Sequence, residues 1–181
     1  VRFVGGKREV YLKGEGYFQV SKDSCRQFIV HLQNSEITVL GTAFNVSAYE
    51  DEAHVYTTLE EGRVVFYSRQ NKQRILLKPG MQSDMEVATG KTVVSEVDPS
   101  LYSAWIEGRF VFQSLDLESI LRQLQRWYDF ELFYADPDVK EMHFTIDILK
   151  YEEISKVLNL MERVNKVKFT QKGRTVVVNS Y

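Results

Sequence analysis

The residues most able to do chemistry in this 181-residue sequence are three histidines, one cysteine and two short acidic runs. Cys25 has no second cysteine, so neither a disulfide nor a multi-thiolate metal site can form within the chain. The acidic runs at 50–52 and 60–61 could supply the two carboxylates of a glycoside hydrolase, but their positions beside predicted turns favour solvated side chains. The histidines lie in or next to predicted strands, without metal-ligand spacing: His31, His54 and His143.

No phosphate-binding loop, nucleophile elbow or dinucleotide-binding motif occurs in the sequence. The charges nearly cancel, with 23 Lys and Arg against 25 Asp and Glu, and neither half is basic enough to predict nucleic-acid binding. The longest apolar runs have about four to six residues, too few to cross a membrane. We therefore expect a protein that has no catalytic activity, no cofactor and no metal.

The elements that must position any functional residue change in type near residue 100. Before it, short runs rich in Val, Ile, Thr and aromatic residues follow one another at strand-like spacing, without the period of an amphipathic helix. These runs are 10–12, 17–20, 28–32, 37–40, 43–49, 54–59, 63–67, 74–77 and 92–94. They predict an all-β domain over residues 1–100, either a multi-stranded sandwich or a solenoid-like unit, and the Asp-Pro-Ser at 98–100 marks its end.

Three glycines are predicted to serve the backbone of this domain. Gly41 divides two apolar stretches, which suggests a bulge or a corner where the chain changes sheets. Gly62 is expected in a tight hairpin turn that needs a positive φ. Gly80 follows Pro79 and predicts a β-turn.

Apolar residues after Trp105 recur at helical spacing in two segments, 117–128 and 154–161. The strand 110–112 matches 144–146 at an offset of 34, and the first helix matches the second at the same offset. The strand after each helix matches at an offset of 37, and a last strand is expected at 175–178. Residues 105–181 are thus predicted to form a small α+β domain with a βαβ repeat, both helices lying on one side of one sheet.

Partner contacts are expected at two places in this second domain. The first is the aromatic end of its first helix, where Trp127, Tyr128 and Tyr134 could either pack or anchor a partner. The second is the strand 144–149, whose apolar and polar residues alternate, so that one face can be buried while an edge stays open to another strand. Its candidate contact residues are Phe144, Thr145 and Ile146.

Several motifs together resemble one family. The segments GEGYFQV (14–20), VLGTAFNV (39–46), TLEEGRV (58–64) and LKPGMQ (77–82) are similar in order and spacing to the periplasmic domain of FecR-like anti-sigma factors. The segments GRFVF (108–112) and LRQLQRWY (121–128) resemble the C-terminal domain of Bacteroidetes members, which is similar to the secretin/TonB short N-terminal domain.

The resemblance implies a sensor and adaptor in the periplasm, as part of a protein anchored in the inner membrane. It would relay a signal from the signalling domain of an outer-membrane TonB-dependent transporter to an extracytoplasmic-function sigma factor. The sigma-binding segment and the transmembrane helix of the family are not in this chain, which opens at Val1. Two alternatives remain: a carbohydrate-binding or carbohydrate-active β-domain of the cell envelope, favoured by an exposed aromatic platform beside paired carboxylates, and a structural envelope protein.

Overall fold

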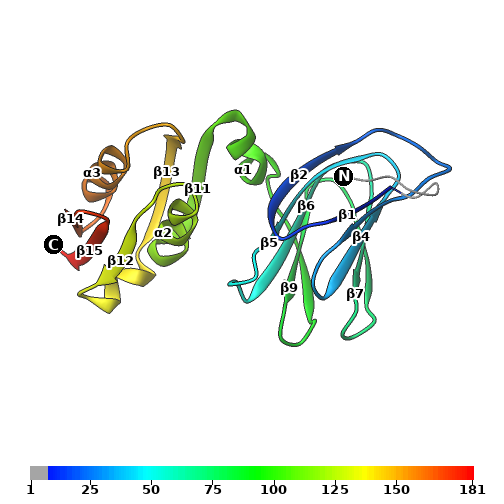
Figure 1. Ribbon diagram of the computed structural model, residues 1–181, viewed down its shortest axis with the longest axis horizontal. Coiled ribbons are helices and arrows are strands. Elements are labelled where there is room, and N and C mark those ends of the chain that lie inside the picture. The colour runs from blue at the N-terminus through cyan, green and yellow to red at the C-terminus, as the bar shows by residue number, and fades with distance from the viewer. Residues whose placement is uncertain (1–7) are drawn as a thin grey trace. The chain divides into compact units, whose positions relative to one another are not determined.

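The computed structural model describes residues 8–181, which divide into two compact units between Ser103 and Ala104 (Figure 1). Each unit has its own cluster of buried apolar side chains. Strands dominate the structure, and none of the sheets formed by the described residues closes into a barrel. The mostly-β class predicted from the sequence is therefore confirmed.

The first unit contains two five-stranded sheets. The strands of the first sheet lie in the order β1 (Arg8–Tyr11), β3 (Phe28–His31), β4 (Ser35–Val39), β7 (Val64–Ser68) and β8 (Arg74–Leu77). Those of the second lie in the order β10 (Thr92–Glu96), β9 (Met81–Glu86), β6 (His54–Glu61), β5 (Thr42–Ala48) and β2 (Gly14–Val20). All pairs are antiparallel except β1 with β3. Before the four-residue helix α1 (Ser100–Ser103), the described residues contain no helix, as predicted.

Alternating side chains from both sheets build one shared core, because successive residues of a strand point to opposite faces. Ile37 and Phe66 enter it from the first sheet, and Phe44 and Leu59 from the second. The sequence did not predict β9, whose residues read as polar. In the structure Met85 of β9 is fully buried in this core, and the strand is paired on both sides.

Two crossings between the sheets explain the positions of Gly41 and Gly62. The chain leaves the first sheet after β4 and enters the second at β5, so it changes sheets at Gly41. It returns between β6 and β7, where Gly62 has a φ of +92°. Because β6 and β7 belong to different sheets, Gly62 lies in a second crossing and not in the predicted hairpin turn. The crossings touch: a Cβ on Gly62 would lie 2.6 Å from the carbonyl oxygen of Gly41.

The chain also turns sharply at Gly80. The amide of Met81 donates to the carbonyl of Lys78 at 3.1 Å, which closes a four-residue turn around Pro79 and Gly80. Gly80 has a φ of +81°. Proline at the second position and a positive φ at the third are the features of a type II turn.

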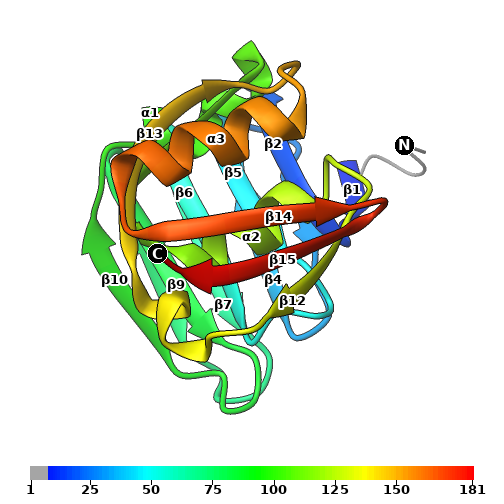
Figure 2. The same ribbon diagram turned by 90° about the vertical axis from the view of Figure 1, so that its left-hand side faces the viewer.

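The second unit has two small sheets instead of the single sheet predicted. One consists of β11 (Arg109–Asp116) and β13 (His143–Leu149), and the other has the order β12 (Glu131–Tyr134), β15 (Thr175–Ser180), β14 (Val167–Lys172). The helices are α2 (Leu117–Gln125) and α3 (Ile154–Val164), with short 3₁₀ turns η1 (Ala104–Glu107) and η2 (Pro137–Glu141). Figure 2 shows α3 running above β14, which it contacts. One cluster of buried side chains joins both sheets and both helices.

Strand, helix and strand follow one another twice in this unit, but the two strands that flank each helix lie in different sheets. The helices correspond at an offset of 37, not at the predicted 34. At that offset the buried residues Ile120, Leu121 and Leu124 of α2 match Val157, Leu158 and Met161 of α3, which are also buried. An error of three residues is close to one helical turn and so preserves the apolar pattern, which is why the sequence alone did not reveal it.

Candidate functional site

The three histidines of the structure each make a separate local contact. Over residues 8–181, no group of three His, Cys, Asp or Glu side chains is placed to hold a metal ion. His54 contacts Asp84 at 2.6 Å on the outside of the second sheet, and His143 contacts the carbonyl of Glu141. Among the helices of the described chain, none has the length and apolar character needed to cross a bilayer.

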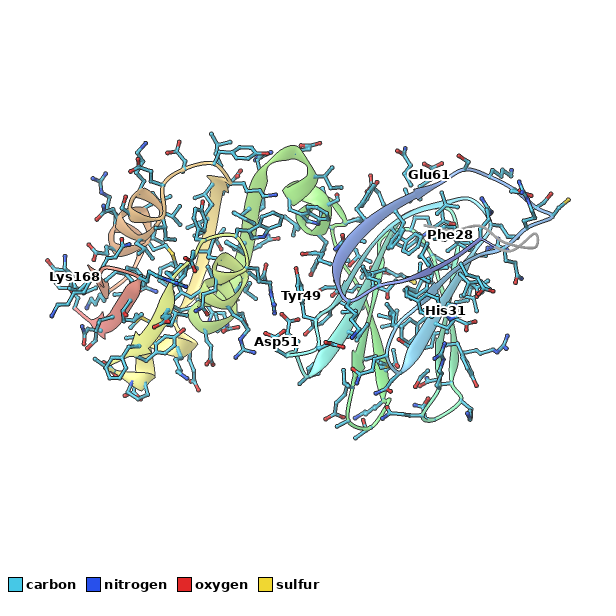
Figure 3. All side chains as sticks on the ribbon, viewed as in Figure 1. Phe28, His31, Tyr49, Asp51, Glu61 and Lys168 are labelled. Carbon is cyan, nitrogen blue, oxygen red and sulfur yellow. The ribbon has the colours of Figure 1, made fainter. Side chains whose placement is uncertain are left out.

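The first unit contains a cleft of about 460 Å³ at one end of its strands. His31 and Tyr49, labelled in Figure 3, are among its lining residues. His31 lies 3.4 Å from Glu9 through one ring nitrogen and 3.4 Å from Glu36 through the other. Its ring stacks on Tyr11 with the ring centres 4.8 Å apart. The histidine is thus held among strands of the first sheet by contacts at both ring nitrogens and at one ring face.

In the second unit, the strand β13 has one open edge. It pairs with β11 alone, and no strand in residues 8–181 lies along its other side. The amide of Lys150 donates to Gly108, and the amide of Leu117 donates to Met142. Since backbone groups alternate sides along an antiparallel ladder, these bonds direct the even-numbered residues of β13 toward β11. The N–H groups of Thr145, Asp147 and Leu149 therefore point to the open edge.

The side chains of β13 alternate as the sequence predicted. Phe144, Ile146 and Ile148 are buried in the core, whereas Thr145, Asp147 and Leu149 are exposed. Two of the predicted contact residues, Phe144 and Ile146, thus have their side chains in the core and their backbone groups turned toward β11. The exposed side chains of the strand are those of Thr145, Asp147 and Leu149.

Thr145 also has a structural task. The pairing of β11 with β13 shifts register between Phe112 and Leu115, which forms a bulge. Ser114 in this bulge has a φ of +48°, and its amide donates to the hydroxyl of Thr145 at 3.0 Å. A non-glycine residue in this conformation is strained, and the hydroxyl of Thr145 helps to hold it.

The aromatic end of α2 is largely engaged within the unit. The hydroxyl of Tyr128 lies 3.0 and 2.9 Å from the carbonyl oxygens of Lys150 and Glu152, so its one proton is shared between them and holds the turn that follows β13. Burial, with a contribution from the nearby charge of Glu152, raises the pKa of Tyr128. Trp127 packs beside Phe110 and Trp105 but is 42% exposed. The structure therefore favours positioning for Tyr128 and leaves part of Trp127 open to a partner.

Tyr134 is the last residue of β12, an edge strand of the other sheet of this unit. Its hydroxyl is buried and has no hydrogen-bond partner. Burial raises the pKa of Tyr134 to about 12. Lys140 lies over the ring, 4.7 Å from its centre. Packing accounts for this residue better than partner contact does.

The sequence analysis did not single out Lys150 and Tyr151, which follow the open strand. Tyr151 is 86% exposed, and Leu149 at the end of the strand is 57% exposed. A signal was present: a lysine between two large apolar residues lies where the predicted strand ends. Such exposed apolar residues in a group are typical of interaction surfaces.

Two family models match the chain: that of the FecR protein over residues 1–65, and that of the FecR C-terminal region over residues 109–178. Two crystal structures of a candidate anti-sigma factor from Parabacteroides distasonis ATCC 8503, at 1.65 and 2.50 Å resolution, have the same fold. The first has a TM-score of 0.87 and 22% sequence identity, and the match covers 99% of this chain and 84% of the other. The second has a TM-score of 0.86 and 23% identity, and the match covers 99% of this chain and 83% of the other. At this identity the likeness shows the fold alone. No curated protein matches the chain.

Proposed function

Because the chain belongs to the FecR family of anti-sigma factors, we propose that it is the periplasmic sensor and adaptor of a protein anchored in the inner membrane. Its partner is the signalling domain of an outer-membrane TonB-dependent transporter, and the sigma factor is reached only through a cytoplasmic segment outside this chain. In this role the protein has no catalytic activity and no cofactor. Residues 1–100 are its all-β FecR-like domain, and residues 105–181 are an α+β domain with a strand–helix–strand repeat.

The open edge of β13 is the observation that carries this function. Three N–H groups, those of Thr145, Asp147 and Leu149, point away from β11 on a strand that has only one partner. A strand from another protein can add to such an edge, with main-chain hydrogen bonds giving affinity and alternate side chains giving specificity. Trp127 supplies exposed aromatic area near the end of this edge, of the kind that interfaces favour.

A proline at Asp147 tests this mode of docking. The amide of Asp147 faces outward, so Asp147→Pro removes a donor from the open edge without removing a bond of the β11–β13 ladder. The change also removes the ion pair between Asp147 and Arg109. Asp147→Ala is the matched control, because it removes the same ion pair and keeps the amide. That pair is exposed, so its loss should cost little stability.

We expect Asp147→Pro to bind the transporter signalling domain at least tenfold more weakly than Asp147→Ala, which is about 1.4 kcal/mol. Circular dichroism must first show that both variants are folded. Equal affinities of the two folded variants would place the docking face elsewhere.

A second candidate function follows from the cleft in the first unit. Tyr11 at its rim is 82% exposed and stacks on His31, which lies between the carboxylates of Glu9 and Glu36. An exposed aromatic ring beside two carboxylates is the arrangement expected of a carbohydrate-binding domain. Calorimetric titration with cellotriose, maltotriose and chitotriose, using wild type and Tyr11→Ala, would detect such binding. Absence of heat with all three sugars would remove this candidate.

A further inference from the structure

Two exposed aromatic side chains flank Lys150, which follows the end of β13. They are Trp127 after α2 and Tyr151, and we call these three residues the lysine patch. Trp127 and Tyr151 are 42% and 86% exposed. A Cβ on Gly108 would lie 3.0 Å from the ring of Tyr151, so that ring covers the backbone that leads from η1 into β11. The patch is thus assembled from two separate segments of the second unit.

Lys150 differs from the other lysines of residues 8–181. All of those are exposed except Lys140, which is partly buried and pairs with Glu118 at 2.9 Å. Lys150 is partly buried too, yet within the described chain no carboxylate lies within salt-bridge distance of its ammonium group. Its neighbours are rings: the centre of Trp127 is 3.1 Å from the nitrogen, and that of Trp105 is 5.9 Å away.

Indole rings attract a cation but do not neutralise it. Burial accordingly lowers the pKa of Lys150, since its ammonium group has lost part of its water. A carboxylate placed beside the nitrogen would give the ammonium group a charged partner. The charge that complements the patch is therefore negative, and its surroundings are apolar.

The patch follows the open edge along the chain but lies on the side of β11. Leu149 is the last residue of β13, and Lys150 follows it directly. The amide of Glu152 donates to the carbonyl of Leu149 at 3.1 Å, so the chain turns at the end of the edge. A protein that docks on this unit next to β13 therefore meets an unpaired positive charge among exposed rings.

We propose that the protein which docks on this unit presents an aspartate or glutamate next to an apolar side chain, and that its carboxylate pairs with Lys150 while the apolar side chain packs on Trp127 and Tyr151. This inference rests on the proposed function and specifies the chemistry of the partner at that site. Lys150 acts there as a contact that selects an acidic partner, and the β13 edge supplies the main-chain pairing.

Substitution of Lys150 with a matched control tests the inference. Lys150→Gln keeps most of the side chain and removes the charge, and Lys150→Glu reverses it. Lys168→Gln is the control: it also removes one lysine charge, but Lys168 is exposed, pairs with Glu162 and lies on β14 (Figure 3). The affinity of the transporter signalling domain is measured for each folded variant at two salt concentrations.

We expect Lys150→Gln to weaken binding about tenfold and to reduce its salt dependence, because one ion pair is lost. Lys150→Glu should weaken it further, and Lys168→Gln should leave it unchanged. A change of the partner's acidic residue to lysine should restore binding to Lys150→Glu. That restoration separates a direct ion pair from an effect on the fold.

Wild-type affinity for Lys150→Gln, while Asp147→Pro still binds more weakly than Asp147→Ala, would overturn this inference and leave docking at the β13 edge intact. Equal affinities of the two Asp147 variants would refute the edge docking itself. Sedimentation of the chain alone supplies a third result: a dimer that Lys150→Glu disrupts would assign the patch to a second copy of the chain, which also overturns the inference.

Discussion

Alanine at Gly62 should destabilise the first unit more than alanine at any other glycine discussed here, because two separate costs add at this position. The first is the backbone: Gly62 has a φ of +92°, and a side chain in the left-handed region costs about 1–2 kcal/mol. The second is contact: the new Cβ would lie 2.6 Å from the carbonyl oxygen of Gly41 and 2.9 Å from the hydroxyl oxygen of Thr42. Forcing the two crossings apart should cost a further 1–3 kcal/mol or so.

Two other glycines separate these costs. Gly80 has a φ of +81°, but a Cβ there would have only the carbonyl oxygen of Val97 nearby, at 3.8 Å. Gly41 has no positive φ, yet its Cβ would lie 2.6 Å from the Cα of Lys22. Alanine also lowers the entropy of the unfolded chain, which returns about 0.4–1 kcal/mol in each variant.

The expected net losses are about 0.5–1 kcal/mol for Gly80→Ala, about 1–2 for Gly41→Ala and about 2–4 for Gly62→Ala. Urea unfolding measures them directly, and for a unit of this size each 1 kcal/mol corresponds to a Tm shift of roughly 4–8 °C. Equal losses for Gly62→Ala and Gly80→Ala would refute the contact between the crossings. Unchanged stability with lost partner binding would instead make Gly41 and Gly62 functional residues.

Three further outcomes follow from single contacts. Tyr128→Phe removes the hydroxyl that holds the turn after β13, so the free energy of unfolding should fall by about 1 kcal/mol. Tyr134→Phe removes a buried hydroxyl without a partner, so stability near pH 7 should be equal or higher. Folding raises the pKa of Tyr134 from about 10 to about 12. The neutral hydroxyl therefore contributes stability that is complete below about pH 10 and is lost as the pH rises through about 12. The free energy of unfolding, measured across this range, should depend less on pH in the phenylalanine variant. Ser114→Gly relieves a φ of +48° and should raise the melting temperature slightly, whereas a lower one would show that the bulge is not strained.

The change from strands to helices near residue 100 could be predicted because periods of 2 and 3.6 residues are properties of the sequence itself. The role of Gly62 could be predicted only in part. Its positive φ follows from a glycine between two apolar runs, but a hairpin and a crossing between sheets place the same demand on the backbone. Only the strand order, which depends on contacts between distant residues, distinguishes them.

The candidate site at β13, like the role of Gly62, could be predicted only in part. The alternation in 144–149 correctly indicated a strand with one buried face, but it could not show which backbone groups face β11. That depends on the register with Phe110 and Phe112. The contacts of Tyr128 and Lys150 join the end of α2 to the turn after β13, and no local pattern specifies such a pair.

Both ends of the open strand are held in place by contacts that a partner need not supply. At one end the hydroxyl of Thr145 accepts the amide of Ser114, and at the other the hydroxyl of Tyr128 and the carbonyl of Gly108 hold the backbone at Lys150. Strand addition costs conformational entropy when either strand must first be ordered. Since β13 is already ordered at both ends, a docking strand meets N–H groups in fixed positions, and the cost of ordering falls mainly on the partner. In the proposed docking, the aromatic residues at the end of α2 therefore act indirectly: the hydroxyl of Tyr128 holds the backbone after the edge, and the ring of Trp127 lies against Lys150.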